Sequence, residues 1–145
     1  MVELRKITED NYNECLALKV SEGQQSFVSP NVYSLAQAWV YHGNAYPYAI
    51  YADNIMVGFI MMGYYAEKGV YDIWYLMIDE KFQRRGYGKA ALALGVAYLK
   101  KEFDVKEIFL CFEPSNAAAE ALYESAGFKR TGEVDGDEII MRLDV

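Results

Sequence analysis

The sequence is poor in the residues that build metal centres and disulfide frameworks. In 145 residues it has one histidine, His42, and two cysteines, Cys15 and Cys111. Because no paired Cys or His spacing typical of a zinc site occurs, we expect no metal. The two cysteines lie far apart among apolar neighbours, and the chain shows no export signal. We therefore expect two buried free thiols rather than a disulfide.

Long apolar runs are also missing. No uninterrupted stretch of about 18 apolar residues occurs, so we expect neither a membrane span nor a membrane partner. The first residues, Met1 to Lys6, lack the apolar core of a secretion signal. This absence favours a cytoplasmic location.

Basic residues are outnumbered. The chain has 14 Lys and Arg against 21 Asp and Glu, which gives a formal net charge of −7. Because phosphate contacts need a basic face, this balance argues against nucleic acid as a partner. Long-range attraction favours a cationic substrate instead, although the same charge also serves solubility alone.

The overall composition of the chain indicates a globular domain. Hydrophobic residues make up 53% of the chain and prolines number only three. This apolar content can offset the entropy cost of ordering the chain. No repeat, low-complexity tract or linker interrupts the sequence, so we predict a single domain over residues 1–145.

Hydrophobic periodicity and turn residues predict an α/β fold with a mixed sheet. The strand over 106–113 is nearly continuously apolar, which is typical of burial on both faces. The predicted elements are, in order, a strand over 2–7, a helix capped by Thr8 or Asp10 and running to Val20, a loop over 21–31, a helix from Ser34 to His42, strands over 47–53, 55–67 and 70–79, a helix over 86–103, a strand over 106–113, a helix from Pro114 to Gly127, and two strands joined at Asp135-Gly136.

The segment from Ile78 to Lys89 joins a strand to a helix and contains two glycines where the helix begins. Backbone N–H groups at a helix start are unpaired, and the helix dipole attracts anions there. Gly86 and Gly88 leave room for a phosphate, and Arg84, Arg85 and Lys89 add positive charge. The segment is therefore a candidate phosphate cradle, with a tight turn as the alternative. The GxxxxGK[ST] loop and the full GxGxxG fingerprint are absent, which weighs against ATP and NAD.

Two motifs carry a resemblance to a known family. Gln83-Arg84-Arg85-Gly86-Tyr87-Gly88 resembles the Arg/Gln-x-x-Gly-x-Gly/Ala motif of the GCN5-related N-acetyltransferases. The later segment SNAAAEALYESAGF, residues 115–128, resembles their N-x-x-A-x-x-L-Y-x-x-x-G-F segment. With the element order, the resemblance covers essentially the whole chain. It implies an acetyl-CoA-dependent N-acetyltransferase whose mostly antiparallel mixed sheet has splayed parallel strands 4 and 5 and about four flanking helices.

The resemblance also implies how the cofactor is bound. Coenzyme A would lie between the splayed strands, with its pantetheine arm along the backbone of Leu76, Met77 and Ile78. Asn116 would contact the cofactor, although its position suits a helix N-cap equally well. The residues implied to hold the pyrophosphate are Gln83, Arg84, Arg85, Gly86, Tyr87, Gly88 and Lys89.

For catalysis, the resemblance implies direct attack of a neutral amine on the thioester, with Tyr123 as general acid to the departing thiolate. From spacing alone, an aromatic residue on an amphipathic helix is more often part of the core. The amine must lose a proton, and Asp72 or Glu113 could accept it. Neither is favoured by the sequence.

The acceptor is expected to be a small cationic amine. Residues 18–41 and 73–92 resemble bacterial spermine/spermidine acetyltransferases, which favours a polyamine. Such a polycation is bound by separated carboxylates and aromatic faces. The candidates are the carboxylates Glu22, Asp72 and Glu113 and the aromatic side chains Trp39, Tyr41, Trp74 and Tyr75.

Other functions stay open. An aminoglycoside is another small polycationic acceptor, and a protein N-terminus or lysine would need a groove for peptide backbone. A non-catalytic acetyl-CoA sensor would not need an acid beside the sulfur, and a purely structural dimerisation domain leaves the glycine loop unexplained. Members of the family often form homodimers, but the sequence indicates no interface.

Overall fold

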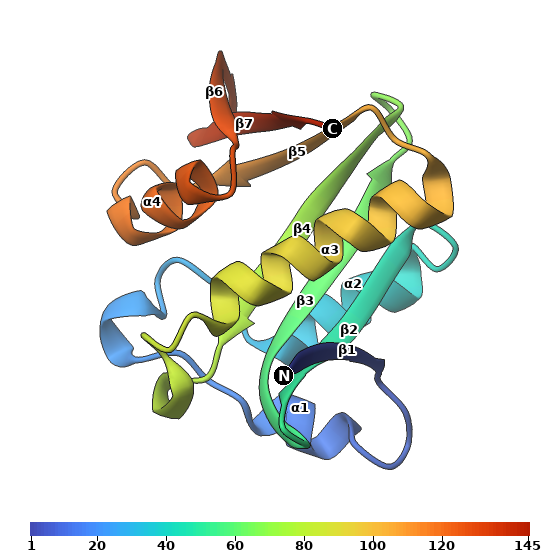
Figure 1. The fold of residues 1–145 in the computed structure, drawn as a ribbon, viewed down its shortest axis with the longest axis vertical. Coiled ribbons are helices and arrows are strands. Elements are labelled where there is room, and N and C mark those ends of the chain that lie inside the picture. The colour runs from blue at the N-terminus through green and yellow to red at the C-terminus, as the bar shows by residue number, and fades with distance from the viewer.

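The computed structural model describes residues 1–145 (Figure 1). The strands are β1 (Val2–Lys6), β2 (Ala45–Ala52), β3 (Ile55–Tyr65), β4 (Val70–Ile78), β5 (Glu107–Phe112), β6 (Lys129–Asp135) and β7 (Glu138–Asp144). The helices are α1 (Tyr12–Ala17), α2 (Asn31–Val40), α3 (Tyr87–Phe103) and α4 (Ala117–Ser125), with 3-10 turns at Glu22–Gln24 and Glu80–Phe82. This is the order of elements that the sequence predicts. None of the helices combines the length and hydrophobicity that crossing a membrane requires.

All seven strands form one sheet in the order β1-β2-β3-β4-β5-β7-β6. Every neighbouring pair is antiparallel except β4 and β5, which are parallel and joined by the crossover helix α3. β4 and β5 are paired only at Asp72 and Phe109, so the two strands separate beyond this point. The prediction of a mixed, mostly antiparallel sheet with splayed strands 4 and 5 is confirmed.

Hydrophobic cores lie on both faces of the sheet. α3 crosses one face, while α2 lies behind the sheet (Figure 1). The core under α3 and α4 contains Leu92, Leu99 and Phe128, and the other core contains Cys15 and Phe59. β3 contributes to both cores and is buried along most of its length. Its side chains therefore connect the two helical layers through the sheet.

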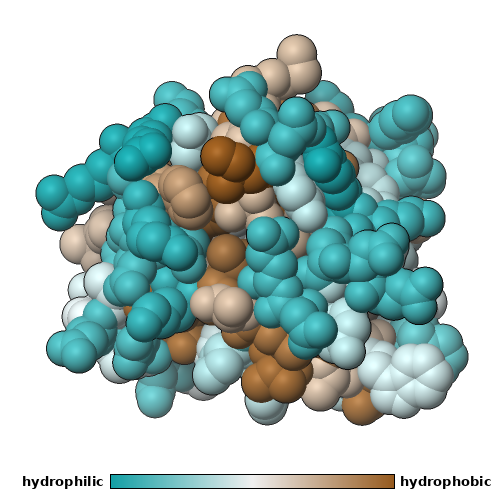
Figure 2. All heavy atoms as spheres, turned by 90° about the horizontal axis from the view of Figure 1, so that it is seen from below, coloured by the Kyte–Doolittle hydropathy of each residue, from teal (hydrophilic) through white to brown (hydrophobic).

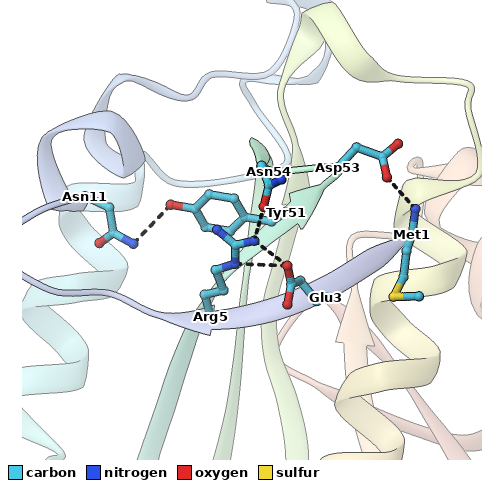
Figure 3. Close-up of polar contacts among 7 residues, drawn as sticks. All are labelled: Met1, Glu3, Arg5, Asn11, Tyr51, Asp53 and Asn54. Atoms are coloured by element: carbon cyan, nitrogen blue, oxygen red, sulfur yellow. Dashed lines mark hydrogen bonds and ion pairs between the residues drawn. The ribbon is translucent and has the colours of Figure 1, made fainter.

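The edge strand β1 is attached to the turn between β2 and β3 by polar contacts (Figure 3). The N-terminal ammonium group lies 2.8 Å from Asp53 Oδ1, and Arg5 Nη2 donates to Asn54 Oδ1 at 2.7 Å. The Arg5 guanidinium also lies over the Tyr51 ring, 4.2 Å from its centroid. These exposed contacts orient β1 but add little stability.

The first two helices differ from the sequence prediction. α1 begins after Asn11 and ends at Ala17 rather than Val20, because the chain becomes extended at Leu18. Beyond it, Lys19 N donates to the buried Asp79 carboxylate, 3.0 Å away, a contact that a continued helix would remove. α2 starts at Asn31 after Pro30, so Ser34 is a buried interior residue and not a cap.

The prediction that β5 is buried on both faces is wrong. Ile108, Leu110 and Phe112 are buried against the α3 side, whereas Phe109 and Cys111 are only partly covered. Cys15 and Cys111 are both free thiols, and only Cys15 is fully buried. The face of β5 that carries Cys111 therefore remains accessible.

Candidate active site

A cavity of about 500 Å³ occupies the region where β4 and β5 separate. Its walls come from the end of β4, the loop and first turn of α3, the end of β5, α4 and the segment between α1 and α2. The end of the molecule that carries the β4–α3 loop is mostly polar, with hydrophobic atoms along a central strip (Figure 2). One space thus joins the predicted phosphate loop to Tyr123.

The loop entering α3 presents unpaired backbone N–H groups. The first helical bond is donated by Ala90 N to Gly86 O, at 3.1 Å, and the N–H groups from Arg84 to Lys89 donate to no protein acceptor. Gly86 has a φ of +82° and Arg84 a φ of +64°, so the chain here turns through left-handed conformations. Successive N–H groups in such a turn, at the positive end of a helix dipole, form an anion site. This arrangement fits a pyrophosphate.

Two side chains fix this loop. Asp79 is buried, and its Oδ1 accepts a hydrogen bond from Lys81 N at 3.0 Å while its Oδ2 accepts the bond from Lys19 N. Gln83 Nε2 donates to Ile78 O at 2.9 Å and to Gln24 Oε1 at 2.7 Å. The side chain of Gln83 therefore connects the loop entering α3 to the segment between α1 and α2.

The end of β4 offers a free backbone edge. Asp79 N donates to Val57 O in β3, and Met77 pairs with Phe59 in the same register. Because backbone direction alternates along a strand, the N–H and C=O groups of Leu76 face the side from which β5 has departed. Leu76, Met77 and Ile78 all line the cavity. An extended ligand arm can add to this edge as a strand would.

The loop side chains are divided between cavity and surface. Gln83, Arg84, Tyr87 and Lys89 line the cavity together with the backbone of Gly86 and Gly88. Arg85 does not line it, because its guanidinium lies over the Phe82 ring at 5.7 Å and donates to Lys81 O at 3.4 Å.

Tyr123 reaches the cavity from α4. Its ring packs against Phe112 and Phe128, and its hydroxyl has no hydrogen-bond partner in the protein. Burial, with a smaller contribution from the charge of Glu138, raises the pKa of Tyr123 to about 12. The phenol is therefore protonated at neutral pH and available as a donor.

Asn116 also lines the cavity and is the N-cap of α4. Its Oδ1 accepts a hydrogen bond from Ala119 N at 3.2 Å, while its Nδ2 donates to no protein group. The capping role is thus observed, and the amide nitrogen is still free to bind a ligand. The two interpretations of Asn116 are compatible.

The candidate bases differ in environment. Asp72 lies on β4 outside the cavity lining, and Trp74 Nε1 donates to its Oδ1 at 3.1 Å. Burial raises the pKa of Asp72 to about 7, although the Trp74 bond and Lys68 act against this rise. Glu113 lines the cavity, and its Oε2 accepts hydrogen bonds from both the backbone and the hydroxyl of Ser115.

The predicted acceptor residues are only partly brought together. Trp74 and Tyr75 line the cavity, and Tyr41 meets the Trp74 ring edge-on at 5.9 Å. Trp39 is 76% exposed and stacks on His42, and the exposed Glu22 lies outside the lining. The structure therefore collects the aromatic residues of β4 and leaves Trp39 and Glu22 apart.

Several lining residues were not anticipated from the sequence: Val20, Gln24, Phe27, Val28, Cys111, Phe112 and Glu138. The first four belong to the segment between α1 and α2, a region that the family resemblance implies for the acceptor site, although the sequence singled out only Glu22 within it. Glu138 begins β7, and no motif singles it out. Only the pairing of β7 with β5 brings it to the cavity.

The chain is similar to known proteins over most of its length. The model of the acetyltransferase (GNAT) family matches residues 6–128. A spermine/spermidine N(1)-acetyltransferase of Bacillus subtilis is 30% identical over 97% of both chains. An aminoglycoside acetyltransferase in complex with coenzyme A superposes with a TM-score of 0.82 at 19% identity, covering 99% of this chain and 95% of the other. A spermidine N-acetyltransferase from Vibrio cholerae, in complex with CoA and spermine, gives 0.76 at 15% identity, covering 97% and 92%.

Proposed function

Because this chain belongs to the acetyltransferase (GNAT) family, we propose that it transfers the acetyl group of acetyl-CoA to a primary amine of a polyamine such as spermine or spermidine. The observation that carries the proposal is the single cavity that joins an anion site at α3 to an unpaired phenol and carboxylates at its other end. The full-length similarity to a spermine/spermidine acetyltransferase supports the choice of acceptor.

The residues of the cavity fit acetyl-CoA, which supplies a pyrophosphate and an acetyl thioester when bound. The N–H groups from Arg84 to Lys89 bind the pyrophosphate, and the side chains of Arg84 and Lys89 compensate its charge. The backbone of Leu76 pairs with the pantetheine arm, and Asn116 Nδ2 donates to the cofactor. Together these groups orient the donor toward Tyr123.

Tyr123 acts as a hydrogen-bond donor to the leaving thiolate. With a pKa of about 12, the phenol is a weaker acid than a thiol, whose pKa is about 8.5. Tyr123 would therefore supply a hydrogen bond that stabilises negative charge on the leaving sulfur, and water rather than the phenol would supply the proton that the thiolate takes up. This places the effect of Tyr123 on turnover rather than on binding.

Asp72 is the proton acceptor we propose for the attacking amine. Its pKa of about 7 suits proton transfer near neutral pH, whereas Glu113 is already engaged by Ser115. Since Asp72 lies outside the cavity lining, the proton reaches it through water. Turnover by the wild type should fall below about pH 7, and Asp72→Asn should lower turnover and remove that dependence.

Attack by the amine is direct rather than through an acetylated cysteine. Cys111 lines the cavity, but burial and the nearby carboxylates raise its pKa to about 11, so it stays a thiol at neutral pH. Cys111→Ala should keep turnover within about threefold of wild type, measured as thiol release. A loss of about 100-fold or more would indicate an acetyl-cysteine instead.

The test of the proposed function is thiol release from acetyl-CoA with a panel of amines. The panel contains spermine, spermidine, putrescine, an aminoglycoside and a lysine-containing peptide. Selective turnover of spermine or spermidine supports the proposal. Selective turnover of another amine would keep the acetyltransferase and reject the polyamine, and binding of acetyl-CoA without any turnover would favour a sensor.

A further inference from the structure

Strand register brings carboxylates to the acceptor end of the cavity. Phe112 of β5 pairs with Ile139 of β7, so the next positions, Glu113 and Glu138, adjoin each other. Glu138 also pairs with Asp135 across the β6–β7 hairpin. Ile139 packs against the core under α3 and α4, so the neighbouring Glu138 points to the opposite, open face of the sheet. Three carboxylates thus meet here, one after β5 and two from the β6–β7 hairpin.

No cation of the protein neutralises this group. The ion pairs of the chain involve other acids, and none includes Glu113, Asp135 or Glu138. Partial burial, followed by the charges of Asp135 and Glu113, raises the pKa of Glu138. An unpaired carboxylate beside like charges is costly unless a cation from outside compensates it.

The same carboxylate lies close to the reacting end. Glu138 and Tyr123 line one cavity, and the charge of Glu138 contributes to the raised pKa of Tyr123. The hydroxyl of the half-buried Tyr123 lies in the cavity without a protein partner, an independent sign that this end receives a polar ligand. Trp74 and Phe27 add apolar surface to the lining. Carboxylate and apolar surface together suit an aliphatic chain that carries ammonium groups.

We propose that Glu138 binds a non-reacting ammonium group of the acceptor and thereby gives the enzyme its preference for polycationic amines. This inference rests on the proposed function. The attacking nitrogen must be neutral, whereas the other nitrogens of a polyamine stay charged at neutral pH. A carboxylate beside the reacting end selects for such a second charge and disfavours a monoamine.

The test compares Glu138→Gln with the wild type by steady-state kinetics on spermidine. The KM for spermidine should rise about 3- to 20-fold, since Glu138 is exposed at the cavity mouth, with kcat and the KM for acetyl-CoA within about twofold. The KM for a monoamine such as hexylamine should change less. Glu133→Gln is the matched control, because Glu133 is an exposed residue of the same hairpin outside the cavity.

An unchanged KM for spermidine in Glu138→Gln, or an equal rise in Glu133→Gln, would overturn the proposal. A fall in kcat at constant KM would also overturn it, because it would place Glu138 in the chemistry. If the wild type acetylates no polyamine, the proposed function has failed separately. Calorimetric titration of spermine into the coenzyme A complex then tests Glu138, and equal or absent binding in wild type and variant rejects its role.

Discussion

The Tyr123 hydroxyl lies in the cavity without a protein partner, although its ring is packed on both sides. Tyr123→Phe removes the hydroxyl and retains this packing. Turnover should therefore fall about 10- to 1000-fold with little change in the affinity for acetyl-CoA. Single-turnover kinetics and calorimetry measure the two quantities. Wild-type turnover in Tyr123→Phe would exclude Tyr123 as the hydrogen-bond donor to the leaving sulfur.

Asp72 gives a second test at this scale. Its pKa rises from 3.8 to about 7 on folding, so the folded protein retains a proton that the unfolded chain releases between these values. Stability should therefore fall as pH rises through this window. At pH 8 the ionised carboxylate costs at most about 4 kcal/mol.

Asp72→Asn removes this titration and keeps an acceptor for Trp74 Nε1. Urea denaturation at pH 5 and pH 8 should show a smaller loss of stability for Asp72→Asn than for wild type. Asp137→Asn, at an exposed position in the β6–β7 turn, is the control and should follow the wild type. If Asp72→Asn and wild type lose stability equally, the carboxyl group of Asp72 does not titrate near neutral pH.

At the scale of elements, the start of α3 allows the proposed anion site to be tested by substitution. A Cβ on Gly88 would lie 3.6 Å from Leu122 Cδ2 and 3.8 Å from Ile78 Cγ1, which is ordinary contact. A side chain at position 88 therefore fits, and the effect of its charge on ligand binding can be measured apart from the effect of its size. Gly88→Asp and Gly88→Asn have the same shape and differ by one negative charge in the anion site.

Gly88→Asp should bind acetyl-CoA about tenfold more weakly than Gly88→Asn, because a negative charge repels the pyrophosphate at the helix terminus. Calorimetric titration measures both dissociation constants, and thermal unfolding checks that both variants fold. Equal dissociation constants would place the pyrophosphate elsewhere.

Helix and strand identities were predictable from periodicity, but several boundaries and exposures were not. Ser34 follows the capping pattern, yet α2 begins at Asn31 because Pro30 precedes it. The nearly continuous apolar residues of β5 predict burial on both faces of the strand, yet Cys111 faces the cavity. A local pattern reports which residues can be buried, whereas neighbouring elements determine which are.

At the scale of the whole molecule, the net charge of −7 should affect how the acceptor arrives. The negative protein attracts a polycation over long distances, and added salt weakens this attraction. At 0.1 M salt the attraction is largely screened beyond the Debye length of about 10 Å. The KM for spermine should rise about fivefold or more between about 20 and 300 mM NaCl. The KM for hexylamine should rise less. A KM for spermine that does not depend on salt would mean that overall charge has no part in binding.

Only the family resemblance singled out Tyr123. The sequence by itself determined the element order, the glycine turn at the start of α3 and the capping position of Asn116. These features are local: a glycine at a helix start or a capping asparagine acts within one turn of chain. The loop from Gln83 to Lys89 could therefore be proposed as a phosphate site before the structure was known.

Only the tertiary structure decided which side chains form the acceptor end. Glu138 is distant in sequence from Trp74, and the register of β5 with β7 brings it to the same cavity. Trp39 and Glu22 have side chains that suit a polyamine, but both lie outside the cavity lining. Strand pairing between distant segments, and the restriction of the β4–β5 ladder to the one pair Asp72 and Phe109, create the cavity, and no local pattern encodes either.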